Sequence, residues 1–156
     1  MLVALVLSQV LYDARGRDSD LEFVELLNAG DRVVDAGGMR LQDDAGEFVV
    51  PPHRPLLPGA HLLVCRNRTA VRAEWGVDPD VWGMGLRLNN EGDVVALLSA
   101  DGRVLDEVAW EGAVPGWGTL EAREGEALVR LDGDARAGEP SAWCVGPPRP
   151  RRGGGF

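Results

Sequence analysis

The chain contains no lysine, so all 16 of its basic residues are arginine, against 25 aspartates and glutamates, and its formal net charge is −9. Affinity for nucleic acid arises largely from the neutralisation of phosphates, so an acidic chain is a poor binder of nucleic acid. The only dense group of arginines is Arg149, Arg151 and Arg152, close to the C-terminus. The charge therefore disfavours a nucleic-acid partner.

Cysteine is scarce as well. The two cysteines, Cys65 and Cys144, belong to no CxxC motif, which excludes a zinc site of the usual spacing. They could form a disulfide or remain as two buried thiols. Buried thiols are favoured because an unpaired cysteine commonly behaves as a small core hydrophobe. Their pairing is left open.

The sequence has no hydrophobic run long enough to cross a bilayer. The most apolar stretch is residues 1–11 (MLVALVLSQVL), which is far shorter than a membrane span. It lacks the basic n-region and the small-residue cleavage site of a signal peptide. We therefore expect a first strand, no signal peptide and no transmembrane segment, and the compartment stays open.

Signatures of catalysis are missing too. Only His53 and His61 could supply an imidazole base, and both flank the Pro58-Gly59 turn. No GxSxG, HExxH or P-loop motif accompanies them, although a nucleophile, a base and an orienting group are needed together. We expect a protein that is not an enzyme and has no cofactor, apart from the calcium alternative described below.

Short apolar segments and turn signals alternate along most of the chain. Leu57-Pro58-Gly59 has the chemistry of a tight turn, and Ala100-Asp101-Gly102 predicts a hairpin. The only helix-like segment is Thr69–Trp75, and Leu86–Asn89 is among the predicted strands. About nine or ten short strands with almost no helix predict an all-β sandwich. We predict one domain over residues 1–146 and a flexible Pro/Arg/Gly-rich tail over residues 147–156.

A set of short motifs follows in order from about residue 3 to 148, and the segments are Leu7–Asp13 (LSQVLYD), Glu22–Asn28 (EFVELLN), Gly38–Leu41 (GMRL), Phe48 with Pro51-Pro52, Leu57–Gly59, Trp82-Gly83, Leu88–Asp93 (LNNEGD), Val108–Trp110, Trp143 and Pro147-Pro148. Their order resembles the lamin tail domain, an immunoglobulin-like β-sandwich, in its prokaryotic form. Two positions depart from the family pattern. Met39 stands where tryptophan is usual, and Gln9 where prokaryotic members commonly have glutamate.

The resemblance implies an immunoglobulin-like fold and a non-catalytic module for protein interaction, scaffolding or anchoring. Prokaryotic members of the family are often appended to exported or surface-associated proteins. An exported or surface setting, or a role as accessory domain of an exported hydrolase, is therefore compatible with the resemblance. Open edge strands would also permit homo-association.

Acidic residues crowd one loop between predicted strands. Asp13, Asp18, Asp20 and Glu22 could offer oxygen ligands to Ca²⁺, which suggests a calcium-dependent surface or adhesion module as an alternative function. Their spacing does not match an EF-hand, and a solvated loop with local ion pairs to neighbouring arginines is the commoner arrangement. On the adjacent strand, Glu25 is expected to point outward and to pair with Arg40.

Tryptophans and the C-terminal arginines are the candidate partner-binding residues. Trp117 lies in a Pro-Gly-Trp-Gly loop, and Trp82 lies in another loop. Tryptophan and arginine are enriched among the residues that dominate binding energy at protein interfaces. The candidate set is Trp117, Trp82, Arg149, Arg151 and Arg152, although tryptophan in a sandwich commonly fills the core.

Overall fold

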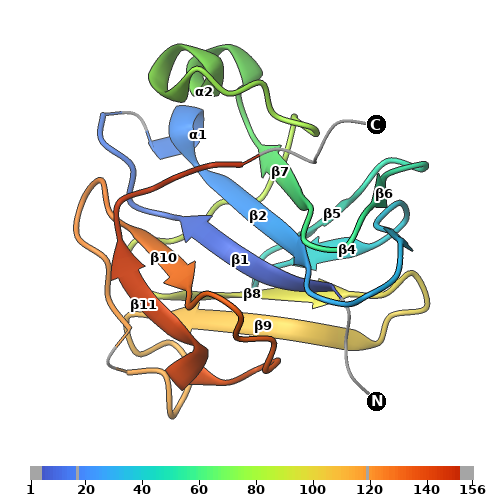
Figure 1. Cartoon of the computed structure of the whole chain (residues 1–156). Coiled ribbons are helices and arrows are strands. Elements are labelled where there is room, and N and C mark those ends of the chain that lie inside the picture. The colour runs from blue at the N-terminus through green and yellow to red at the C-terminus, as the bar shows by residue number, and fades with distance from the viewer. Residues whose placement is uncertain (1–4, 17, 119, 152–156) are drawn as a thin grey trace.

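The protein is a sandwich of two antiparallel sheets (Figure 1). The computed structural model describes residues 5–16, 18–118 and 120–151. The first sheet has the order β11-β10-β1-β2-β7, the second has the order β5-β4-β8-β9, and β3 and β6 form a separate pair. The strands are β1 (Leu5–Leu11), β2 (Phe23–Asn28), β3 (Val34–Asp35), β4 (Arg40–Gln42), β5 (Glu47–Val49), β6 (Pro55–Leu56), β7 (His61–Cys65), β8 (Asp93–Leu98), β9 (Val104–Trp110), β10 (Ala127–Arg130) and β11 (Trp143–Gly146). The predicted all-β sandwich is confirmed.

In the described residues, helical structure is limited to α1 (Asp18–Leu21), α2 (Arg68–Trp75) and a 3₁₀ turn at Pro140–Ala142. Figure 1 shows α1 and α2 together at one end of the sandwich. Within the described part of the chain, no helix is long and apolar enough to cross a membrane.

Strand β1 is buried along its whole length, and one of its faces contributes to the main core. Leu5 and Leu7 point into the main core between the sheets, and so do Val10 and Tyr12 further along. Side chains alternate between the two faces of a strand, so the change from odd to even numbers requires one extra residue. That residue is Ser8, at a bulge between the pairs Leu7–Leu26 and Gln9–Glu25.

Two aromatic rings fill the main core near the end of β1. Tyr12 and Trp110 stack with their ring centroids 4.6 Å apart and their planes 13° from parallel. The indole N–H of Trp110 donates to the carbonyl of Asn89 at 2.8 Å, and the hydroxyl of Tyr12 accepts from the amide of Ala122 at 2.7 Å. Burial raises the pKa of Tyr12 to about 12. Both polar ends are thus hydrogen-bonded, as buried tyrosine and tryptophan require.

A second, smaller core lies between the outer face of the first sheet and α2. Asn67 caps α2, because its side-chain oxygen accepts from the amide of Ala70 at 3.0 Å. Val71 and Trp75 pack toward the sheet, and Trp75 meets Phe23 edge-on with centroids 5.5 Å apart. The helix predicted from Thr69 therefore exists, and it begins one residue earlier.

One predicted strand does not form. Leu86 and Leu88 are buried and Arg87 is exposed, so the alternation read from the sequence is real. However, residues 86–89 pair with no neighbouring strand, and the carbonyls of Leu86 and Asn89 instead accept from the side chains of Arg66 and Trp110. Alternation identifies the buried face, but it does not supply a strand partner.

A buried ion pair joins the two sheets. Asp106 of β9 pairs with Arg130 of β10, and both side chains are almost fully buried. The backbone of Leu7 in β1 lies between them: its amide donates to Asp106 at 2.9 Å, and its carbonyl accepts from Arg130 Nε at 2.6 Å. Strand β10 pairs with β1 at Gln9 and Val10. At Leu7 the two charged side chains take the place of that partner strand.

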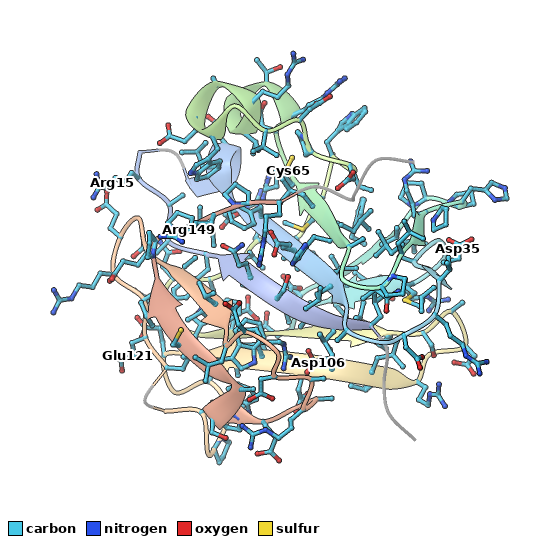
Figure 2. All side chains as sticks on the ribbon, in the orientation of Figure 1. Arg15, Asp35, Cys65, Asp106, Glu121 and Arg149 are labelled. Carbon is cyan, nitrogen blue, oxygen red and sulfur yellow. The ribbon has the colours of Figure 1, made fainter. Side chains whose placement is uncertain are left out.

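Further groups complete this ion pair. The other oxygen of Asp106 accepts from the amides of Glu107 and Gly138, at 2.9 and 2.8 Å. The guanidinium of Arg130 lies 4.9 Å from the ring centroid of Trp143 in β11 and donates to the carbonyl of Arg136 at 3.0 Å. Figure 2 shows Asp106 between the ribbons of β1 and β9. A buried charge is tolerated only when it is paired and hydrogen-bonded, and both conditions are met here.

We predict that Asp106→Ala lowers the free energy of unfolding by about 3–5 kcal/mol, because Arg130 is left as an unpaired buried charge. Arg130→Met should cost a similar amount, since Asp106 then loses the guanidinium. Urea denaturation measures both. The matched control is Arg40→Gln, which removes the exposed pair between Arg40 and Glu47 at 3.8 Å and should cost less than about 1 kcal/mol. Equal losses for the Arg130 and Arg40 variants would contradict the prediction.

Candidate functional site

Trp82 presents the most prominent aromatic surface of the described chain. Its side chain is 51% exposed, whereas its neighbours Val81 and Met84 are buried. The segment is fixed to the edge of β7, because Cys65 donates its amide to the carbonyl of Val81 at 3.0 Å and accepts from the amide of Met84 at 3.0 Å. Trp82 is therefore exposed on a backbone that is anchored on both sides.

An arginine holds one face of the Trp82 ring. The guanidinium of Arg68, on α2, lies 4.5 Å from the ring centroid. Asp78 binds the same guanidinium through two hydrogen bonds of 2.8 and 3.0 Å. A planar guanidinium can stack on an aromatic ring and bind a carboxylate at the same time. Trp82, Arg68 and Asp78 together form what we call the Trp82 surface.

The other predicted tryptophan is not at the surface. Trp117 is 4% exposed and belongs to the main core. Its loop folds inward, with the amide of Trp117 donating to the carbonyl of Val114 at 3.1 Å and the amide of Leu120 donating to Trp117 at 3.1 Å. The ring of Trp117, predicted to contact a partner, thus fills a space inside the sandwich and offers little surface for such a contact.

Arg149 and Arg151 lie against the outer face of the first sheet. Arg149 exchanges two hydrogen bonds with Gln9, donating its amide at 3.0 Å and accepting from Nε2 at 2.7 Å. Arg151 donates to Glu25 from its amide at 2.8 Å and from its guanidinium at 3.0 Å. The described part of the predicted flexible tail, residues 147–151, thus docks on β1 and β2. Arg152 and the residues after it lie outside the described residues.

Glu25 is the centre of this contact. Its carboxylate is fully buried and also accepts from Ser8 Oγ at 2.7 Å and Gln9 Nε2 at 3.0 Å. His61 Nε2 lies 3.9 Å away, and burial lowers the pKa of His61 although the charge of Glu25 opposes that shift.

The expected pair between Glu25 and Arg40 does not form: Glu25 pairs with Arg151, and Arg40 pairs with Glu47 in the other sheet. Beside the docked segment runs a groove of about 470 Å³, lined in part by Val129 and Cys144.

The acidic loop predicted to bind calcium is spread over separate contacts. Asp13 accepts from the side-chain amide of Asn90 at 3.2 Å, and Asp20 from that of Asn67 at 3.5 Å. Glu22 lies 3.8 Å from Arg66 Nη1. These three carboxylates belong to no metal-sized acidic group among the described residues. The side chain of Asp18, the fourth predicted ligand, lies outside them.

A different group of carboxylates does come together. Asp43 and Asp44 lie in the turn between β4 and β5, and Asp93 begins β8. Each offers an oxygen within 4.8 Å of the other two. The pKa of Asp93 is raised overall. Burial is the largest cause, and the charges of Asp44 and Asp43 add to it, while hydrogen bonds from the amides of Val94 and Asn89 oppose it. Sequence reasoning missed this group because its members are about fifty positions apart and meet only when β4 pairs with β8.

The two cysteines are both free thiols. They lie in β7 and β11, the two edge strands of the first sheet. Four strand spacings of about 4.8 Å separate those edges by roughly 19 Å, far beyond the reach of a disulfide. Cys65 is buried, as favoured from the sequence, but Cys144 is exposed.

We predict that a thiol reagent titrates Cys144 in the folded protein and reaches Cys65 only after denaturation. Cys65 is shielded, and burial, with a smaller contribution from the charge of Asp78, raises its pKa to about 12. Because the thiolate is the reactive form, Cys65 should be inert near neutral pH. Absorbance titration with an aromatic disulfide reagent measures this. A folded Cys144→Ser variant that still reacts rapidly would contradict it.

We predict that removing residues 149–156 lowers the free energy of unfolding by about 1–3 kcal/mol, because Glu25 and Gln9 lose hydrogen-bond partners. Removal of residues 152–156 alone is the control, since it leaves the bonds of Arg149 and Arg151 in place. In a Glu25→Gln background the longer truncation should cost less. Urea denaturation measures all five chains: the whole chain, the two truncations, and the Glu25→Gln chain with and without residues 149–156. Equal stability of the longer truncation and the whole chain would show that the docked segment contributes nothing.

Comparison with known proteins agrees with the architecture. A search of curated proteins gave no match. A family model described as Lamin Tail Domain matches residues 3–112, which is more than half of the chain. The match contains β1 to β9 and ends at Gly112, so β10 and β11, which complete the first sheet, lie beyond it. The β-rich sandwich and this match together show that the chain belongs to the lamin tail domain family.

Proposed function

We propose that the protein is a non-catalytic binding module that anchors a protein partner through the Trp82 surface. The observation that carries the proposal is the half-exposed indole of Trp82. The Arg68 guanidinium lies over its ring, and the backbone on both sides of Trp82 is hydrogen-bonded to β7. A large apolar side chain that is already ordered loses little conformational entropy on binding. Tryptophan and arginine are also the residue types most enriched among interface hot spots.

The partner that suits this surface offers an apolar pocket for the free face of the indole and acceptors for Arg68 and Arg72. Arg72 lies near Asp78, with 3.9 Å between Arg72 Nε and the carboxylate, and its side chain is more than half exposed. Asp78 is shared by the two arginines, whose guanidinium groups carry further donors for acceptors on a partner. An acidic rim around the pocket would therefore complement the Trp82 surface.

The surroundings of two potentially reactive side chains, Cys65 and Glu25, support a role without catalysis. The thiol of Cys65 is buried, and its pKa of about 12 keeps it protonated. The carboxylate of Glu25 is engaged by donors from Ser8, Gln9 and Arg151, so it is poorly placed to accept a proton from a substrate. A nucleophile and its base must lie within hydrogen-bond reach of one another with capacity to spare.

The alternative of a calcium-dependent surface module using Asp13, Asp18, Asp20 and Glu22 gains less support. Asp13 and Asp20 each accept from an asparagine side chain, and Glu22 lies beside Arg66. Groups engaged in this way have less capacity for a cation. The Trp82 surface is therefore the preferred basis for the function.

The proposal is tested by placing a photo-crosslinking phenylalanine derivative at position 82 in the protein's own host. Position 104 serves as the matched control, because Val104 is also apolar and 56% exposed, but lies on β9. We expect a crosslinked protein specific to position 82. For that partner in purified form, Trp82→Ala should weaken affinity by about 30-fold or more, as a hot-spot residue does, and Val104→Ala by less than about 2-fold. Equal crosslinking at both positions, or wild-type affinity of Trp82→Ala, would refute the proposal.

A further inference from the structure

The carboxylates of Asp43, Asp44 and Asp93 form the one metal-sized acidic group among the described residues. Strand β4 pairs antiparallel with both β5 and β8, so the turn after β4 is brought beside the start of β8. Two of the three carboxylates belong to residues removed from solvent: Asp93 is 2% exposed and Asp43 is 7% exposed. Asp44 is exposed and leaves one side of the group open to solvent.

No positive side chain among the residues that the structure describes forms an ion pair with this group. Among the described residues, none of the three carboxylates takes part in an ion pair. The three other buried carboxylates each lie beside an arginine: Asp106 pairs with Arg130, Glu25 with Arg151, and Glu22 with Arg66. Like charges in a poorly solvated site repel one another strongly, so an arrangement of this kind favours a bound cation.

One oxygen in the group has no partner of its own. Asp43 Oδ1 accepts from the amides of Ala45 and Gly46 at 2.9 and 2.7 Å, which occupies both of its lone pairs. Asp43 Oδ2 is buried and has no hydrogen-bond partner among the described residues. An unpaired carboxylate oxygen removed from water is costly, and it is rare unless a ligand satisfies it. This orphan oxygen is independent of the mere clustering of acidic residues.

Backbone amides hold the other buried carboxylate in position. Asp93 accepts from the amide of Val94 at 2.8 Å and from that of Asn89 at 3.2 Å. Each of these bonds uses one lone pair of a different oxygen, so each oxygen of Asp93 retains a lone pair. Together with Asp43 Oδ2 and the exposed carboxylate of Asp44, the site offers oxygen ligands from three residues and leaves room for water.

We propose that Asp43, Asp44 and Asp93 bind Ca²⁺, tying the β4–β5 turn to the start of β8. The ligands are all carboxylate oxygens, which suit a hard cation, and the absence of histidine or cysteine from the group argues against zinc. Ca²⁺ accepts irregular geometry and a mixture of carboxylate and water ligands, whereas Mg²⁺ demands a near-ideal octahedron. With three protein residues and the rest water, the affinity should fall in the weak range of extracellular modules, about 10⁻⁴–10⁻³ M.

The test is calorimetric titration of the EDTA-treated whole chain with CaCl₂, together with thermal unfolding in millimolar Ca²⁺ and in EDTA. We expect a dissociation constant of about 10⁻⁴–10⁻³ M and a higher unfolding temperature in Ca²⁺. Asp44→Asn should weaken binding at least about tenfold. It should leave folding in EDTA intact, because Asp44 is exposed and takes part in no described hydrogen bond. No heat and no change in unfolding temperature would overturn the proposal.

The matched control is Asp20→Asn, which alters the loop that the sequence had suggested instead. It should leave Ca²⁺ binding unchanged, and loss of binding in this variant with retention in Asp44→Asn would overturn the assignment. A second readout uses Tb³⁺ as a luminescent substitute for Ca²⁺. Asp93 pairs with Trp110 across β8 and β9, so Tb³⁺ at the site should be sensitised by tryptophan excitation and displaced by Ca²⁺. Sensitised emission that persists in Asp44→Asn, or Mg²⁺ binding as tight as that of Ca²⁺, would refute the Ca²⁺ site as proposed.

Discussion

The closure of the sandwich depends on the ion pair between Asp106 and Arg130. Asp106 lies within the region that matches the lamin tail domain, and Arg130 lies beyond its end at residue 112. The pair therefore fastens β10 and β11, which lie beyond the matched residues, to the part of the fold that the family model covers. It does so through the backbone of Leu7, whose amide and carbonyl both bind the charged side chains. Without β10 and β11 the five-stranded sheet would end at β1, and the outer edge of that strand would have no partner.

Three of the buried acidic sites are stabilised in three different ways. Asp106 has a buried arginine, which makes the contact part of the core. Glu25 has an arginine whose side chain is about half exposed, on a segment that docks from outside the sheet. The group at Asp43 and Asp93 has backbone amides but no described positive partner. Since a buried carboxylate must be paired, hydrogen-bonded or protonated, the kind of partner indicates which site is structural and which has capacity for a ligand.

The strands and turns could be predicted from the sequence because alternation and turn residues are local signals. The segment from Glu22 to Asn28 and the hairpin at Ala100-Asp101-Gly102 carry such signals, and both appear in the structure. What failed depends on distant partners. Residues 86–89 alternate correctly but find no strand beside them, and Trp117 sits in a turn-rich segment that folds into the core. The group of Asp43, Asp44 and Asp93 exists only through the pairing of β4 with β8, which no local pattern specifies.

The bulge at Ser8 changes which residues face the core: odd-numbered residues do so before it, and even-numbered residues do so after it. Leu5 and Leu7 face inward before it, and Val10 and Tyr12 face inward after it, while Ser8 and Gln9 both turn toward Glu25. The orientation of half a strand is thus encoded by a residue count rather than by residue type. Suppose that this chain is aligned with a relative that lacks the bulge. If the one-residue gap is placed away from Ser8, every residue between Ser8 and the gap is matched one position out, so core positions are matched with surface positions. Relatives with and without this residue can therefore share a core while their strand positions correspond only after the count is corrected.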